Sequence, residues 1–128
     1  MRQRKLGHRW LVVAGLAGVA TLVAFNFDAL MIGAGSLLGD KRPVLLREAR
    51  WADPASAEQF NQRFVAGTRE ALLVDWLQDN RFAVDPASKR AHRLVESLPC
   101  NEFVQVSWQA REGKLLGAAA TVTEAGCL

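Results

Sequence analysis

Two stretches near the C-terminus of this chain alternate between apolar and polar positions. Residues 103–110 and 115–123 each repeat with a period of two, which predicts half-buried β-strands. One face of these strands carries Val104, Val106, Trp108 and Ala110 in the first stretch, and Leu116, Ala118, Ala120 and Val122 in the second. The intervening Arg111-Glu112-Gly113-Lys114 is typical of a tight turn. The pattern therefore predicts an antiparallel hairpin.

The two cysteines of the chain bracket this hairpin. If Ala110 faces Leu115, paired residue numbers sum to 225, and Cys100 then lies opposite Ala125, two residues from Cys127. We therefore expect a Cys100–Cys127 disulfide, which favours an oxidising compartment. Two other interpretations are a metal pair and a reactive thiol, but two cysteines supply only half of a zinc site. We predict no metal and no cofactor.

Helical spacing precedes the hairpin. Phe60 and Phe64 stand four residues apart, and Asp53 followed by Pro54 is a good helix start, which predicts a helix from about residue 54 to 65. Gly67 ends that helix, and Thr68 is expected to cap a second one.

The second helix is expected to end near Asn80, and a short strand follows at Phe82 and Val84. Residues 92–98 form either another strand or a loop. The order of elements predicts an α+β fold in which two helices pack on a small antiparallel sheet, preceded by an N-terminal transmembrane helix.

The N-terminal third has the pattern of a membrane anchor. Residues 1–9 are basic, and residues 10–27 then run for eighteen positions without a charge. As a helix these eighteen residues span about 27 Å, close to the roughly 30 Å hydrocarbon thickness of a bilayer. A cleaved signal peptide is the alternative, with Gly33-Ala34-Gly35 as its best cleavage site. The length of the apolar run favours the uncleaved anchor.

These observations predict a domain order and a location. Residues 1–9 form a cytoplasmic basic tail, 10–38 a transmembrane signal anchor, 39–52 a linker and 53–128 a small α+β domain. Four basic residues precede the span, so the positive-inside bias places the tail in the cytoplasm. The expected location is the bacterial inner membrane, as a single-pass protein whose C-terminal domain lies in the periplasm.

The distribution of charge excludes a general affinity for nucleic acid. The chain carries a net charge of +3, but residues 40–128 hold twelve basic and twelve acidic side chains. The excess therefore belongs to the N-terminal segment, and the domain has no overall attraction for a polyanion. The expected partners are the lipid bilayer and a protein of the envelope.

Four residues are candidates for contact with that protein. Trp51 lies in a polar stretch before the first helix and is expected to form an exposed contact or a lid. The others belong to the one basic cluster of the domain, which fits lipid headgroups or an acidic partner: Lys89, Arg90 and Arg93. The ordinary interpretation of such a cluster is a solvated loop.

One segment resembles a known family. Gly67-Thr68-Arg69-Glu70-Ala71-Leu72-Leu73-Val74-Asp75-Trp76-Leu77 resembles the turn and second helix of the SmpA/OmlA (BamE-type) small envelope proteins and of the related β-lactamase-inhibitor-like fold. The resemblance covers residues 58–123. It implies two helices on a three-stranded sheet and a non-enzymatic binding or assembly role. The chain lacks that family's lipid-attachment cysteine and the glycine-x-proline after the helix.

The sequence therefore predicts a non-enzymatic, membrane-anchored periplasmic binding or accessory module of an envelope complex. Two alternatives belong to other classes. One is a small thiol-dependent enzyme that uses Cys100 and His92. The other is a structural tether subunit that acts through its transmembrane helix, where Gly15 and Gly18 give a smooth face.

Overall fold

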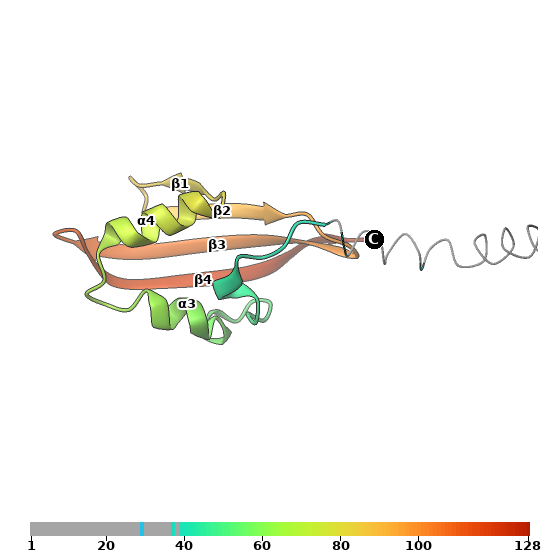
Figure 1. Cartoon of the computed structure of the whole chain (residues 1–128), viewed down its shortest axis with the longest axis horizontal. Helices are drawn as coiled ribbons and strands as arrows, with labels where there is room; N and C mark the ends of the chain where they lie inside the picture. Colours follow the sequence, from blue (N-terminus) through green and yellow to red (C-terminus); the bar gives the residue numbers. More distant parts are fainter. Residues whose placement is uncertain (1–28, 30–36, 38) are drawn as a thin grey trace, which may run out of the picture. The chain divides into compact units, whose positions relative to one another are not determined.

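The domain is a four-stranded antiparallel sheet with two α-helices. The computed structural model describes residues 29, 37 and 39–128, of which Gly39–Leu128 form one compact unit. The strands follow the order β1-β2-β3-β4 and are β1 (Ala83–Asp85), β2 (Arg90–Val95), β3 (Cys100–Arg111) and β4 (Lys114–Cys127). The helices are α3 (Glu58–Arg63) and α4 (Glu70–Asp79), with the 3₁₀ turns η1 (Val44–Leu46) and η2 (Pro54–Ser56) (Figure 1). The predicted α+β architecture is confirmed.

The predicted cytoplasmic tail (1–9) lies outside the described residues, as does nearly all of the predicted membrane span (10–38). Among the residues that the structure does describe, no helix is long and apolar enough to cross a membrane.

One face of the sheet is buried by the helices. Along β2 and β3 every second side chain points into this core, which Ala120 and Val122 of β4 also enter, and Val104, Val106 and Val122 are at most 1% exposed. Leu73 and Leu77 of α4 stand one helical turn apart and are fully buried against them. An aromatic cluster completes the core, with ring centroids 5.0–5.8 Å apart: Phe60, Phe64, Trp76 and Phe82.

The hairpin is confirmed, but its pairing departs from the expected constant sum of 225 for paired residue numbers. Ala110 pairs with Leu115 as expected, and the two-residue loop Glu112-Gly113 has positive φ at both positions, as a type I′ turn requires. Irregularities next to Ala110 and Asn101 each add one unpaired residue to β4. The sum therefore rises from 225 to 227, and Cys100 lies directly opposite Cys127.

The first irregularity also corrects the expected faces of β4. Leu115 is 1% exposed and lies in the core, whereas Leu116, expected on the apolar face with Ala120 and Val122, is 57% exposed. The extra residue shifts the phase of the alternation, and a strict period of two cannot reveal such a shift.

The helices are shorter than their sequence patterns suggest. The expected helix at 54–65 is split into η2 and α3, because Ala57 between them leaves the helical conformation. Arg69 rather than Thr68 is the N-cap residue of α4, and it makes no side-chain cap. The hairpin replaces the cap, since the Glu70 amide donates to the Gly113 carbonyl at 2.9 Å and Thr68 pairs through its carbonyl with Leu115.

Residues 39–52 belong to the folded unit, although the sequence pattern indicated a linker. Leu46 is fully buried, and Ala49 is 5% exposed. The Asp40 amide donates to the Glu96 carbonyl at 2.8 Å, and the Ala52 amide donates to the Val122 carbonyl at 2.8 Å. This segment, called the strap below, therefore reaches from the end of β2 to the middle of β4.

The outer edge of β4 is covered by the chain itself at the start of the strand and again at Val122. Trp51 forms a parallel bridge with Val122, and Arg69 forms an antiparallel bridge with Lys114. The Gly67 amide donates to the Leu115 carbonyl at 2.8 Å. Helix α3, which lies between these two points in the sequence, runs beside β4 (Figure 1).

Candidate functional site

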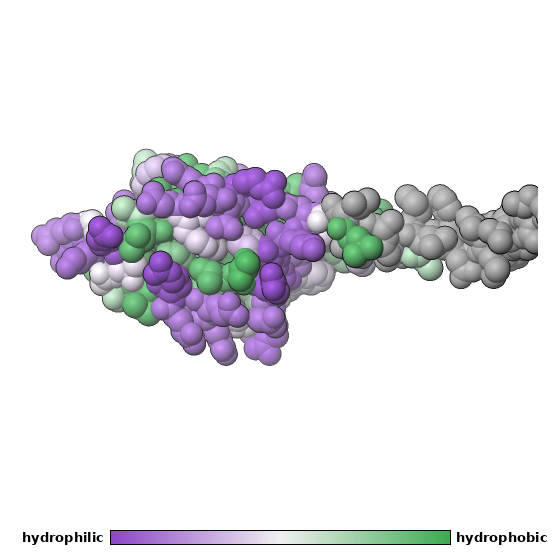
Figure 2. Space-filling model, in the orientation of Figure 1, coloured by the Kyte–Doolittle hydropathy of each residue, from purple (hydrophilic) through white to green (hydrophobic). Residues whose placement is uncertain are grey.

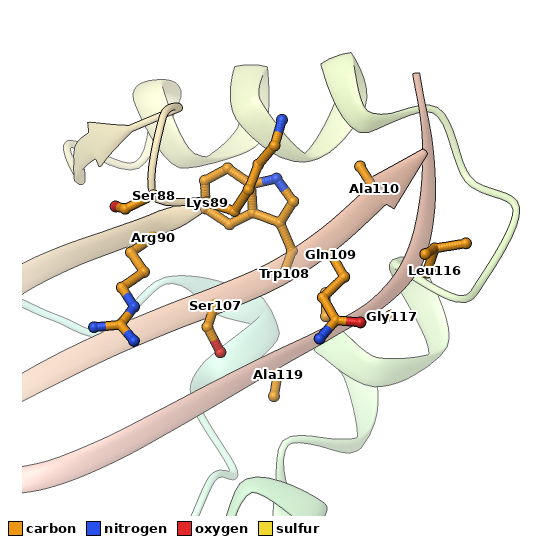
Figure 3. A pocket seen from close by; sticks show the side chains of 11 residues that line it. Ser88, Lys89, Arg90, Ser107, Trp108, Gln109, Ala110, Leu116, Gly117 and Ala119 are labelled. Atoms are coloured by element: carbon orange, nitrogen blue, oxygen red, sulfur yellow. The ribbon is translucent and has the colours of Figure 1, made fainter. Parts of the chain in front are cut away.

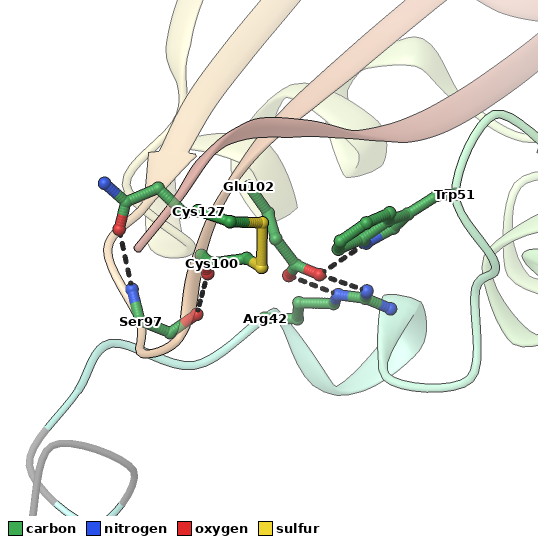
Figure 4. Close-up of a disulfide and its surroundings, with 7 residues drawn as sticks. Arg42, Trp51, Ser97, Cys100, Glu102 and Cys127 are labelled. Atoms are coloured by element: carbon green, nitrogen blue, oxygen red, sulfur yellow. Dashed lines mark hydrogen bonds and ion pairs between the residues drawn. A yellow bond between two sulfur atoms is a disulfide. The ribbon is translucent and has the colours of Figure 1, made fainter. Parts of the chain in front are cut away.

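The disulfide lies at the end of the sheet where the strap begins. Cys100 and Cys127 are 4.0 Å apart at their Cα atoms and are disulfide-bonded, as predicted. Ser97 holds the loop that leads into β3, because its hydroxyl donates to the Cys100 carbonyl at 2.8 Å and its amide donates to the Asn101 side-chain oxygen at 3.2 Å (Figure 4). This end of the sheet is thus fixed by a covalent bond.

A charged cluster next to the disulfide fastens the strap to β3. Glu102 accepts hydrogen bonds from both ends of the Arg42 guanidinium, one of them at 2.6 Å, and from the Trp51 indole nitrogen at 2.7 Å (Figure 4). Arg42 also donates to the Ala49 carbonyl at 2.5 Å. The hydrogen bonds from Arg42 hold the pKa of the Glu102 carboxyl below its ordinary value, against the opposing effect of its burial.

This cluster gives the strap a predicted pH dependence. Because the folded state lowers the pKa of Glu102, the ionised carboxylate stabilises the fold above its ordinary pKa of 4.5, and this contribution is lost as the pH falls through the lower folded value. Glu102→Gln should cost about 2 kcal/mol at pH 7 and progressively less toward pH 3. Unfolding by urea at pH 7, 5, 4 and 3 measures the difference. Glu124→Gln, on the strand residue paired with Glu102, is the control; equal losses at every pH for Glu102→Gln would contradict the assignment.

The predicted contact residues do not lie on one surface. Trp51 is 43% exposed, but Glu102 holds its indole nitrogen. Lys89 is paired with Glu70 of α4, which also accepts a hydrogen bond from the Trp108 indole nitrogen at 2.8 Å. Lys89 and Trp108 therefore connect the sheet and its β1–β2 turn to α4, whereas Trp51 connects the strap to β3.

Arg93 is buried rather than exposed. Its side chain is 7% exposed, and its guanidinium binds Asp40 of the strap at 2.7 Å and the Asn80 carbonyl at 2.9 Å. The basic cluster is divided because β2 alternates: Ala91, Arg93 and Val95 face the core, and Arg90 faces the other side. Arg93 thus stabilises the strap, and Arg90 is the only one of the three cations on the uncovered face.

That uncovered face is the candidate binding surface. Arg90, Ser107, Gln109 and Ala119 point away from the helices, while Trp108 points toward α4 (Figure 3). A hollow of about 710 Å³ lies over this part of the sheet, and Gly117, Ala119 and Ser107 form its floor. The opposite, helical side appears in Figure 2 as largely hydrophilic with small separate apolar areas.

The sequence contained the signal for this face. Residues 117, 119, 121 and 123 of β4 are glycine, alanine and threonine, so one side of that strand carries only small side chains. These small side chains leave space on the uncovered side of β4, and larger residues at the same positions would fill the hollow. Sequence reasoning singled out Arg90 but not the small residues of β4 that lie across the sheet from it, because an uncovered face is recognised only once the helices are placed.

The chemistry available at the disulfide end is limited. Both cysteines are bonded to each other, so the thiol-dependent alternative has no thiolate in this state. His92 lies on the uncovered face, where its ring stands 5.6 Å from that of Phe103. Among residues 39–128 the carboxylates with shifted pKa values are engaged in ion pairs or turns: Asp40, Glu70, Asp85 and Glu102.

Comparisons of the chain with protein-family models, with curated proteins and with solved structures found no match. A function therefore has to be argued from the geometry of this chain.

Proposed function

We propose that this chain is a membrane-anchored module of the bacterial envelope that acts by binding a protein partner. In this proposal residues 10–38 anchor it in the inner membrane, and the domain lies in the periplasm. The uncharged run of residues 10–27 supports the anchor. The disulfide supports an oxidising compartment. The resemblance of residues 67–77 to SmpA/OmlA proteins favours the same non-enzymatic class.

The observation that carries the binding role is the one-sided sheet. The core face is covered by α3, α4 and the strap, whereas the other face presents a hollow over small side chains. The open face of such a sheet is available to a partner, and a concave area lined by apolar and polar groups is the default place to look for a binding site. No group of three potential metal ligands occurs in the described part of the chain, and its buried polar side chains are satisfied by structural contacts.

Thiol labelling of membranes tests the location. Intact cells are treated with a membrane-impermeant alkylating reagent, with and without prior treatment with a membrane-impermeant reductant. We expect labelling of Cys100 and Cys127 only after reduction, because the disulfide protects both sulfur atoms. Reduced cysteines in untreated cells that resist the impermeant reagent but react after lysis would place the domain in the cytoplasm and overturn the proposal.

Exchanging the predicted transmembrane helix distinguishes the proposed binding role from the structural-tether alternative. Replacing residues 10–27 by an unrelated membrane span leaves the domain intact and removes the small-residue face that includes Gly15 and Gly18. If the domain carries the function, a deletion phenotype in the source bacterium is complemented by this chimera. Loss of complementation with normal membrane insertion would favour the tether.

A further inference from the structure

We propose that the uncovered face of the sheet binds an acidic segment of a protein partner and that Arg90 is the central contact. This inference rests on the proposed binding function and adds the chemistry of the partner. It depends on three features of the face: the short side chains that line it, its unpaired cations, and its mixture of apolar and amide side chains.

The strand register determines which side chains lie next to each other on this face. Arg90 of β2 pairs with Ser107 of β3, which pairs with Ala119 of β4, so the three side chains form one row across the sheet. The next row toward the hairpin is Gln109 with Gly117. Because these rows carry short side chains on β4, an incoming segment can approach the backbone there closely.

Arg90 lies between two depressions of this face. It borders the hollow of about 710 Å³ and also a second one of about 360 Å³, which continues along the sheet over His92, Gln105 and Thr121. Its guanidinium extends over the sheet beside Ser107 (Figure 3). A ligand that fills either depression therefore contacts Arg90.

The charges of the face favour an acidic ligand. Of the five ion pairs among residues 39–128, none involves Arg90, Arg111 or Lys114. Strand alternation places Arg111 and its partner Lys114 on the same side as Gln109. Unpaired cations attract carboxylates and raise the rate of association with an acidic partner.

Two carboxylates, Asp85 and Glu112, lie near these three cations and reduce their combined charge from +3 to +1. Asp85 is the strand partner of Arg90, but its carboxylate accepts hydrogen bonds from the Ser88 hydroxyl at 2.6 Å and from the Ala87 amide at 3.1 Å. The hydrogen bond from the Ser88 hydroxyl is the main cause of its lowered pKa. Glu112 belongs to the exposed hairpin turn. The face therefore keeps an excess of positive charge.

The rest of the face fits a single segment of another protein better than the same face of a second copy of this chain. Leu94 is 46% exposed and neighbours Phe103, whereas Gln105 and Gln109 offer amides. In a symmetric dimer the face would meet itself and bring its cations together. With strands about 4.8 Å apart and about 3.3 Å of rise per residue, the face measures roughly 400–500 Å², the scale of one helix or extended segment.

Photo-crosslinking in the source bacterium tests this inference on the full chain. A photoreactive amino acid replaces Ala119 on the uncovered face, and in a second variant it replaces Gln78 on the exposed side of α4. We expect position 119 to crosslink to one protein, and mass spectrometry of the adduct should locate a segment with several Asp or Glu residues. Position 78 should not give this adduct.

Charge reversal then tests the role of Arg90. Arg90→Glu should reduce the adduct about tenfold, because a repulsion replaces an attraction. Arg47→Glu is the matched control on the strap, since Arg47 is exposed and forms no ion pair among residues 39–128. Changing the crosslinked acidic residue of the partner to arginine should restore the adduct with the Arg90→Glu variant. Unchanged thermal unfolding of each variant shows that its fold is intact.

Several results would overturn the inference. They are an adduct with another copy of this chain, an adduct with lipid, a partner segment without carboxylates, or an adduct that Arg90→Glu leaves unchanged. Crosslinks from position 78 alone, in a domain that thiol labelling places in the periplasm, would refute this face and leave the proposed function standing. A cytoplasmic domain would refute the proposed function itself.

Discussion

Leu46→Ala will lower the free energy of unfolding by about 3 kcal/mol, although Leu46 lies in a segment with the sequence pattern of a linker. Leu46 is the fully buried side chain by which the strap packs on the core, and truncating a buried leucine loses its transfer energy and leaves a cavity. The strap should then loosen, and the ion pairs of Asp40 and Arg42 should weaken with it. Urea unfolding of the purified chain in detergent micelles, followed by tryptophan fluorescence, measures the loss.

Val44→Ala in the same 3₁₀ turn is the control. Val44 is 61% exposed, so its truncation should cost less than about 0.5 kcal/mol. Similar small losses for both variants would show that residues 39–52 contribute little to folding and that the strap is a linker after all.

Removal of the disulfide should have the second large effect. Cys100 and Cys127 are 27 residues apart, and on the chain-entropy model closing a loop of that size stabilises the folded state by about 3–4 kcal/mol. Cys100→Ser, Cys127→Ser and the double variant should all show this loss, because each removes the same bond. The comparison is made by urea unfolding at pH 7.

Chemical reduction distinguishes the stability lost with the disulfide from the stability lost through the serine substitutions themselves. Reduced parent protein should match the serine variants, and adding reductant to the variants should change nothing. If Cys100→Ser were much less stable than Cys127→Ser, local packing at Cys100 and not the crosslink would account for the loss.

Local patterns predicted the parts of the fold that depend on local physics. The alternation of residues 103–110 and the Glu112-Gly113 turn determine the hairpin, and the hairpin then brings the cysteines together. Phe60 and Phe64 predicted the buried side of α3 for the same reason. The disulfide followed without any knowledge of the remaining fold.

The features that local patterns missed depend on distant partners. The strap is recognised only when Arg42 meets Glu102, sixty positions later, and when Asp40 meets Arg93. Its own signal was weak, a short apolar run at Val44-Leu45-Leu46 followed by Ala49 after a charged and proline-containing start. The added residues in β4 shift its alternation without changing its composition. The uncovered face likewise depends on where two helices pack, which no local pattern specifies.

The partly covered edge of β4 has a consequence for neighbouring copies of this domain. A long strand with a bare edge offers unpaired amides and carbonyls to the same strand of a neighbouring molecule, and such pairing propagates into insoluble aggregates. Here Trp51-Ala52 pairs with that edge at Val122, and the segment Gly67–Arg69 pairs with it at Lys114 and Leu115. The opposite edge strand, β1, has only three residues. The edges of the sheet therefore offer little free backbone for pairing with another copy of the domain, while its open face stays available.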